Sequence, residues 1–223
     1  RLGAPFEMAH LGATVDSRSV IERTAIKFLP VEWCAQAPVE LFLELRKRID
    51  WRDIEAIDVF GYEFLYNEIG GGRNDGPEKW DPKTRETADH SLAYILAVTL
   101  VDGEISLESF DLERVEDPAL RPLMQKISVS VDPATLELES PRQPVRFEIC
   151  LKNGDIIEEA CEYPFGHPMN PAGSAMVSEK FMALAERTVD ADAAVDLLSI
   201  LRELADDSDL GQLTNAMRKL PVH

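Results

Sequence analysis

The sequence predicts an α+β protein in which a unit of mixed strands and helices is followed by a purely helical segment. Short alternating apolar stretches typical of strands occur among helical patterns up to about residue 164. A stretch rich in Pro and Gly then runs from Tyr163 to Gly173, and only helical patterns follow it. We therefore expect a leading loop at 1–20, an α+β domain at 21–164 and a C-terminal helical segment at 165–223.

The first half of the α+β domain is expected to contain two strands and two helices. Alternating character predicts strands at 22–29 and 54–64, and apolar residues at helical spacing predict a helix at 39–48. Residues 67–83 are rich in Gly and Pro, which predicts a loop long enough to be a candidate for function. Residues 84–101 form the most apolar helix of the sequence, so this helix must be covered on nearly all sides.

The second half returns to strands and then changes to helices. A short helix is expected at 118–126, followed by strands at 128–131, 145–151 and 156–162. The dipeptide Asn153–Gly154 predicts a hairpin turn between the last two strands. Helices are expected at 175–188, 191–205 and 210–220, with Asp190 and Asp209 as the N-caps of the last two. These helices could pack on one another or complete a helical domain supplied by another chain, and we favour the second arrangement.

Charge and composition argue against several classes of partner. The 223 residues carry a net charge of -18 and their basic residues are dispersed, which disfavours nucleic acids and anionic membrane surfaces. No apolar run is long enough to cross a bilayer, so a soluble globular protein is expected. The chain does not start with a secretion signal, which makes the cytoplasm the default expectation. An anionic small substrate would need Lys, Arg or His gathered in one cleft.

The cysteines, histidines and glycines predict neither a metal site nor a nucleotide site. Cys34, Cys150 and Cys161 are odd in number and widely spaced, so we expect reduced and mostly buried thiols. Histidine pairs and Cys/His pairs at metal-binding spacing do not occur in the sequence. The glycines at 70–72 match neither a P-loop nor a dinucleotide fingerprint, which indicates a mobile loop.

The first candidate site is the junction that follows the predicted strand at 22–29. Lys27 could present its ammonium to a carboxylate, while Glu32 and Gln36 could form hydrogen bonds around a hydroxyl. The alternative is a surface Lys, a first-turn Glu favoured by the helix dipole and a solvated Gln. Spacing alone favours this alternative.

The second candidate site is the start of the apolar helix. If one helix runs through residues 84–101, His90 and Tyr94 lie at positions i and i+4 on one face, with Arg85 and Ser91 near its N-terminal end. Helix N-termini attract anions, and a His with a Tyr could relay protons. A capped helix start whose His and Tyr bind local backbone groups explains the same residues equally well.

Four segments resemble motifs of the MmgE/PrpD family. Residues 80–103 resemble its DPxTRETADHSLPY…DG signature, with Ala93 where Pro is usual. Residues 27–40 resemble the K…PAEFHSQTAVE stretch of the 2-methylcitrate dehydratase branch. Residues 5–7 and 166–181 are similar to the PFEG and GxPxNP…KF elements. The four motifs occur in family order and extend over nearly the whole chain, so the resemblance is specific.

The resemblance implies an α+β lid domain followed by the last helices of a large helical domain, with the active site between the two. In the family an Asp and a His from the earlier helical portion join a Lys, a His and a Tyr from the lid. By position, the Lys matches Lys27 and the Tyr matches Tyr94. The position five residues after the Lys is His in the aconitate decarboxylase branch but is Glu32 here, as in the dehydratase branch, which favours dehydration. Cys34 stands where that branch often has His and Pro38 adjoins the next helix, so the substrate could differ.

Residues and resemblance together predict a cofactor-free and metal-free lyase that removes a proton and water from a small polycarboxylate such as 2-methylcitrate. The expected catalytic residues are Lys27, Glu32, His90 and Tyr94, and the expected substrate-binding residues are Gln36, Arg85 and Ser91. One alternative is isomerisation, epimerisation or decarboxylation of a related acid. Another is a non-catalytic subunit or fragment that needs a helical-domain partner. Family members are usually homodimers, so a homodimer or association with a helical-domain chain is expected.

Overall fold

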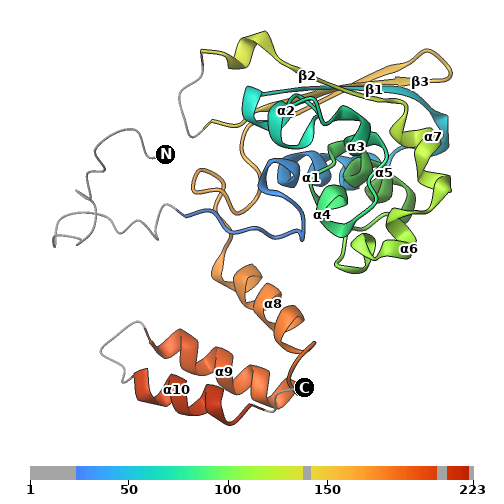
Figure 1. The fold of residues 1–223 in the computed structure, drawn as a ribbon. Coiled ribbons are helices and arrows are strands. Elements are labelled where there is room, and N and C mark those ends of the chain that lie inside the picture. Colours follow the sequence, from blue (N-terminus) through green and yellow to red (C-terminus); the bar gives the residue numbers. More distant parts are fainter. Residues whose placement is uncertain (1–23, 138–141, 205–209, 221–223) are drawn as a thin grey trace, which may run out of the picture. The chain divides into compact units, whose positions relative to one another are not determined.

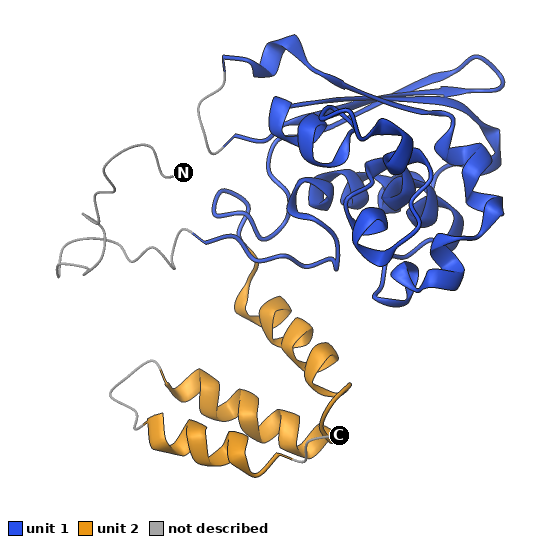
Figure 2. Ribbon diagram, viewed as in Figure 1, with its two compact units in different colours: residues 1–171 blue, residues 172–223 orange. Residues whose placement is uncertain are grey.

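The computed structural model describes residues 24–137, 142–204 and 210–220, and the chain divides into two compact units (Figure 2). Unit 1 comprises residues 1–171 and unit 2 comprises residues 172–223. Unit 1 combines a four-stranded mixed sheet with helices, which confirms the predicted α+β class. Among the residues described, none of the helices has the length and apolar character needed to cross a bilayer. The predicted leading loop at 1–20 lies outside the described residues.

The sheet of unit 1 has the strand order β2-β1-β3-β4. Its strands are β1 (Ile54–Gly61), β2 (Ile127–Val131), β3 (Val145–Leu151) and β4 (Ile156–Cys161). β1 pairs parallel with β2 and antiparallel with β3, which in turn pairs antiparallel with β4. The strands predicted at 128–131, 145–151 and 156–162 are confirmed to within one residue at each end. Gly154 adopts a φ of +90° in the turn between β3 and β4, as expected for the glycine of this hairpin.

The two faces of the sheet differ in polarity. Buried Val145, Phe147 and Ile149 alternate along β3 and face the helices. The other face carries a row of carboxylates, because Asp58 pairs with Glu148 and Glu148 pairs with Glu158 across the strands. Like charges placed opposite each other across strands are unfavourable. In this row, the Glu148 carboxylate also forms an ion pair with Arg146.

The helices of unit 1 cover one face of the sheet (Figure 1). They are α1 (Gln36–Leu45), α2 (Glu63–Ile69), α3 (Gly76–Trp80), α4 (Arg85–Asp89), α5 (Leu92–Asp102), α6 (Leu112–Val115) and α7 (Arg121–Met124). Short 3-10 turns are η2 (Trp33–Ala35), η3 (Trp51–Asp53), η4 (Glu108–Phe110), η5 (Pro118–Leu120) and η6 (Pro133–Thr135). Every residue from Leu92 to Leu100 in α5 is buried, which confirms that this helix is covered on all sides.

Several predicted elements of the first half are wrong in type or extent. Residues 24–29, the described part of the predicted strand at 22–29, form no strand, because their backbone bonds go to one side chain and one distant carbonyl instead. The strand predicted at 54–64 ends at Gly61, since α2 begins at Glu63 and buries residues at helical spacing. The loop predicted at 67–83 contains the end of α2 and all of α3.

Two helices also have different bounds from those predicted. The helix predicted at 39–48 begins at Gln36 and ends at Leu45. The single helix predicted at 84–101 is two helices, because each begins with its own capping side chain. Thr84 accepts a hydrogen bond from the Thr87 N–H at the start of α4, and Ser91 accepts one from the Tyr94 N–H at the start of α5.

Unit 2 contains α8 (Ser174–Ala185), α9 (Ala191–Glu203) and α10 (Leu210–Arg218). The predicted cap Asp190 is confirmed, because its carboxylate accepts a hydrogen bond from the Ala193 N–H at 2.8 Å. Asp209 lies outside the described residues. Unit 2 begins at Ala172, and the loop residues Phe165 and Gly166 bond within unit 1. That these helices complete a larger helical domain stays a prediction.

Candidate functional site

The segment that carries Lys27 is held by hydrogen bonds on both sides of that residue. On one side, the Ile26 N–H donates to the Gly166 carbonyl at 3.0 Å. On the other, the N–H groups of Phe28 and Leu29 both donate to Gln36 Oε1 at 3.1 Å. Lys27 itself is exposed. The segment therefore presents an exposed cation on a backbone that is anchored without secondary structure.

Gln36 supplies one of these anchors with its whole side-chain amide. It is fully buried as the first residue of α1. Its oxygen accepts two backbone N–H groups, and its Nε2 donates to the carbonyls of Leu29 at 2.9 Å and Val31 at 3.2 Å. A Gln amide has two donors and two acceptor sites, so none is left for a ligand. The expected contact between Gln36 and a substrate does not fit this arrangement.

Glu32 lies beside two neutral hydrogen-bonding groups. Its carboxylate accepts a hydrogen bond from the Cys34 N–H at the start of η2. Cys34 is buried and its thiol shares a hydrogen bond with the hydroxyl of Tyr62, the N-cap of α2. Burial, followed by the charge of Glu32, raises the pKa of Cys34 to about 12. Burial also raises the pKa of Tyr62. The thiol and the phenol are therefore both protonated at neutral pH.

Tyr62 was not among the predicted site residues because it falls inside the strand predicted at 54–64. The packing of η2 against α2 brings it beside Cys34 and Glu32. The spacing of Leu65 and Ile69 after Gly61 is helical, and both side chains are buried. That spacing is the sequence signal that could have placed Tyr62 at a helix start.

His90 and Tyr94 do not share a helix face, and the expectation that they do is wrong. α4 ends at Asp89, and Ser91 has an extended backbone between the two helices. The His90 side chain is 47% exposed, and its Nδ1 lies 3.2 Å from the Glu86 carbonyl oxygen. Because of the break at Ser91, the side chain four residues later is not above His90 on the same surface.

Tyr94 lies in the core instead. Its side chain is fully buried, and its hydroxyl donates to the Ser109 carbonyl at 2.5 Å. Its ring also packs against Phe110, with ring centroids 6.0 Å apart. Burial raises the pKa of Tyr94 to about 12. Tyr94 is thus inside the core, whereas Lys27 and His90 are exposed.

The two predicted substrate-binding residues of the second site differ in accessibility. Ser91 is fully buried, where its hydroxyl donates to the Lys79 carbonyl and caps α5. Arg85 is exposed as the first residue of α4, and its Nη2 donates to the Leu107 carbonyl at 2.7 Å. A guanidinium has five N–H donors, so Arg85 can hold this carbonyl and still bind an anion.

Four of the predicted residues are exposed or partly buried and belong to two different segments, and the other three are buried. Lys27 and Glu32 belong to the segment that leads into η2, which packs on α1 and α2. Arg85 and His90 belong to α4, which packs on α3, α5, α6 and η4. Gln36, Ser91 and Tyr94 are buried and hold other parts of the chain.

The loop that ends unit 1 packs around His167. Its imidazole is buried and stacks on Tyr163 and Trp33, with ring centroids 4.7 Å and 6.3 Å away. Nδ1 accepts a hydrogen bond from the Met169 N–H at 3.0 Å, and burial lowers the pKa of His167. In the same loop, the Phe165 N–H donates to the Glu40 carboxylate of α1. This loop is therefore fixed to α1.

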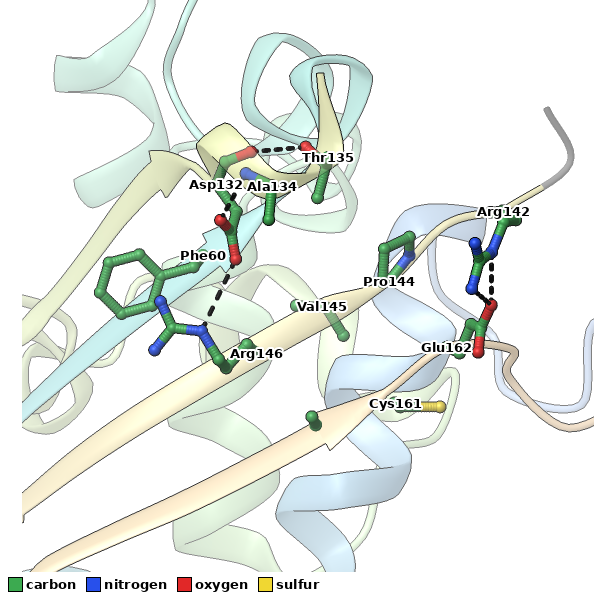
Figure 3. Close-up of a pocket in the computed structure, with 11 residues that line it drawn as sticks. Phe60, Asp132, Ala134, Thr135, Arg142, Pro144, Val145, Arg146, Cys161 and Glu162 are labelled. Carbon is green, nitrogen blue, oxygen red and sulfur yellow. Dashed lines mark hydrogen bonds and ion pairs between the residues drawn. The ribbon is translucent and has the colours of Figure 1, made fainter. Parts of the chain in front are cut away.

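A separate hollow of about 490 Å³ lies at one end of the sheet and contains none of the predicted site residues (Figure 3). Arg146 lies over the Phe60 ring at 3.9 Å and pairs with Asp132 at 3.6 Å. Arg142, at the far side of the hollow, pairs with Glu162. Both guanidinium groups are thus neutralised by carboxylates of the same chain.

Comparison with known proteins gives the family. Residues 29–206 match the MmgE/PrpD C-terminal domain. Cis-aconitate decarboxylase of Mus musculus is 26% identical over 144 residues, which are 61% of this chain and 28% of that protein. The 2-methylcitrate dehydratase of Cupriavidus necator is 27% identical over 175 residues, which are 73% of this chain and 34% of that protein.

The matched region is the C-terminal part of a longer family architecture. A third relative, the mitochondrial 2-methylcitrate dehydratase of Yarrowia lipolytica, is 28% identical over 99 residues, or 42% of this chain and 19% of that protein. The chain thus spans about a third or less of the length of these relatives. The family match covers most of the chain, and the chain belongs to the MmgE/PrpD family.

Proposed function

We propose that this chain forms the lid part of a lyase that dehydrates a small hydroxy-polycarboxylate such as 2-methylcitrate. The family includes relatives named as dehydratases and decarboxylases, which supports lyase chemistry in general. The observation that carries the proposal is the anchored and exposed Lys27, followed five residues later by the Glu32 carboxylate. A carboxylate-bearing substrate needs such a local cation, because the chain as a whole has a net charge of -18.

The proposed roles follow from the chemistry of the side chains that are not fully buried. Lys27 and Arg85 bind substrate carboxylates. Glu32 and His90 arrange the proton that leaves the carbon next to a carboxylate and the proton that joins the departing hydroxyl, so that water is released. Tyr94, with its hydroxyl on the Ser109 carbonyl, stabilises the lid and takes no part in the chemistry.

A substitution of Lys27 tests this proposal. In the active protein, Lys27→Ala is expected to lower kcat/KM for dehydration by about 100-fold or more, a loss typical of one essential charged group. Lys152→Ala is the matched control, because Lys152 is also an exposed lysine but lies at the turn after β3. Formation of the new double bond is followed by ultraviolet absorbance. Equal activity of the two variants would remove Lys27 from the site.

Decarboxylation is the second candidate reaction, since two relatives are named cis-aconitate decarboxylase. Glu32, however, stands at the position where the dehydratase branch has Glu and the decarboxylase branch has His, which favours dehydration. A panel of hydroxy acids and cis-alkenes separates the reactions, because dehydration creates a double bond and decarboxylation releases carbon dioxide. Release of carbon dioxide from an unsaturated tricarboxylate without dehydration of any hydroxy acid would favour the decarboxylase.

The described helices of unit 2 are proposed to complete a helical domain whose other helices come from outside residues 1–223. Ala194 is the one hydrophobic side chain of these helices that is buried. Several large apolar side chains are exposed, which a packed helical domain would cover: Met176, Leu184, Val195, Leu201, Leu210 and Met217.

We therefore expect the isolated 223-residue chain to be inactive until such a partner, or a second copy, is bound. Size-exclusion chromatography with light scattering measures the assembly. Full dehydratase activity of a monomeric 223-residue chain would contradict this expectation. It would mean that the chain contains a complete active site and is not a non-catalytic subunit.

A further inference from the structure

The backbone around Lys27 is anchored at points on both sides, although residues 24–32 form no helix or strand. Ile26 precedes Lys27 and its N–H bonds to Gly166, while Phe28 and Leu29 follow and bond to Gln36. Gln36 is seven or eight residues away from the groups that it bonds, whereas Gly166 is 140 residues away from Ile26. Between the two anchors, Ile26 and Lys27 themselves are exposed.

The Gly166 anchor depends on the absence of a side chain. Gly166 has a φ of +83°, which favours glycine. A Cβ at this position would lie 2.2 Å from the Ile26 carbonyl oxygen and 3.0 Å from the Phe28 ring. The neighbouring Phe165 packs its ring on Phe28, with centroids 4.7 Å apart. At Gly166 the backbone of the 163–170 loop therefore packs directly against the backbone of the Lys27 segment, with no room for a Cβ.

The Gln36 anchor bonds the segment from both directions. It accepts the N–H groups of Phe28 and Leu29 and donates to the carbonyls of Leu29 and Val31, so four backbone groups converge on one buried amide. Unpaired backbone groups at a partly buried site are unfavourable, and Gln36 satisfies all four. A hydrophobic side chain of similar size could fill the space but could not hold the segment.

We infer that Gln36 and Gly166 are positioning residues, which fix the backbone on both sides of Lys27 and so fix the base of the side chain that binds substrate. The lysine side chain is long and flexible, so it loses conformational entropy when it binds substrate. If its backbone is already fixed, less conformational entropy is lost in that step. The structural part of this inference stands on the hydrogen bonds alone. Its effect on turnover rests on the proposed function.

The Gly166 anchor is tested by comparing two glycine substitutions. Gly166→Ala combines an unfavourable φ with a clash against Ile26, whereas Gly154→Ala has a similar φ of +90° and no atom within 4 Å of the added Cβ. Amide hydrogen exchange is measured by NMR on the full 223-residue chain. Protection of the Ile26 amide is expected to fall by about tenfold or more in Gly166→Ala alone. Equal protection in the two variants would overturn this anchor.

The Gln36 anchor is tested by a graded pair of variants. Gln36→Leu removes all four hydrogen bonds, while Gln36→Glu keeps the two acceptor bonds and loses the two donor bonds. Amide protection of Phe28 and Leu29 is expected to fall by about tenfold or more in Gln36→Leu and by less in Gln36→Glu.

Thr99→Val is the matched control, because it removes one buried side-chain hydrogen bond, from Thr99 to the Ile95 carbonyl, within α5. Thr99 precedes Leu100, whose carbonyl accepts a hydrogen bond from Arg46 at the C-terminal end of α1. Gln36 is at the N-terminal end of α1, so Thr99 is remote from it. Unchanged exchange at Phe28 and Leu29 in both Gln36 variants, or the same loss in Thr99→Val, would overturn the inference.

The link to turnover is tested by a double-mutant cycle in the active protein. If Gln36 acts through Lys27, Gln36→Leu lowers kcat/KM at least tenfold in the parent and by less than twofold in the Lys27→Ala background. Equal losses in both backgrounds would contradict positioning of Lys27. Should Lys27→Ala itself retain full activity, the proposed function fails, while the exchange measurements still decide whether the anchors exist.

Discussion

Helix α5 and the segment at 24–31 belong to the same unit but are held in place by different forces. From Leu92 to Leu100, α5 is fixed by the burial of every side chain. Before Val31 the segment has no fully buried side chain, and its backbone is fixed by hydrogen bonds to Gln36 and Gly166. Burial makes a helix stable but hides its polar groups, as for Tyr94. Anchoring by hydrogen bonds leaves a side chain such as Lys27 exposed to a ligand.

The largest expected effect is the loss of core packing in α5. Leu96→Ala is expected to lower the free energy of unfolding by about 2–5 kcal/mol, because Leu96 is fully buried and its removal leaves a cavity. Leu112→Ala is the control, since that leucine is 54% exposed and its loss is expected to cost no more than about 0.5 kcal/mol. Urea unfolding of both variants measures the difference. Similar losses of unfolding free energy in the two variants would mean that Leu96 in α5 is packed no better than the exposed Leu112.

A smaller effect is expected when only the hydroxyl of the buried tyrosine is removed. Tyr94→Phe leaves the Ser109 carbonyl without its donor, which is expected to cost about 1–3 kcal/mol of unfolding free energy. Activity per folded molecule is expected to stay near that of the parent, in contrast to Lys27→Ala. A large loss of kcat with unchanged stability would mean that Tyr94 is a catalytic residue. The buried helix α5 would then contribute to catalysis as the Lys27 segment is proposed to do.

The smallest expected effect is a pH dependence of the loop that anchors Lys27. Burial lowers the pKa of His167 below its ordinary value of 6.5, and Nδ1 must stay unprotonated to accept the Met169 N–H. Because the folded state favours the neutral ring, this contribution is complete above pH 6.5 and is lost as the pH falls below that value. An NMR titration of the His167 ring, together with Met169 amide exchange, checks this. A titration midpoint at or above 6.5 would contradict it.

The parts of the fold that were predicted correctly are those set by local pattern. Alternating apolar residues and the Asn153–Gly154 turn predicted β3 and β4, and the Asp190 cap predicted the start of α9. The failures occurred where a polar side chain decides the structure. Ser91 starts a new helix in the middle of an apolar run, and Gln36 takes the hydrogen bonds that a strand at 24–29 would need.

The candidate site was predictable only in the part that is not fully buried. Lys27 and Glu32 were identified from a motif, and the structure places them in the anchored segment before η2. The burial of Gln36 and Tyr94 depends on which distant residues pack against them, which spacing along the chain does not encode. Tyr62 was missed because the alternating pattern of β1 continues in the sequence beyond Gly61, where the strand ends.

The row of carboxylates on the sheet has a consequence for how copies of this chain meet at high concentration. β4 is at the edge of the sheet, where unpaired backbone groups invite another strand, and Glu158 lies on it next to Glu148 of β3. Two such edges would approach each other with their negative charges facing, which opposes aggregation while those acids are ionised. Glu158→Val is therefore expected to increase light scattering of concentrated samples at neutral pH, and an unchanged signal would show that other features keep the edges apart.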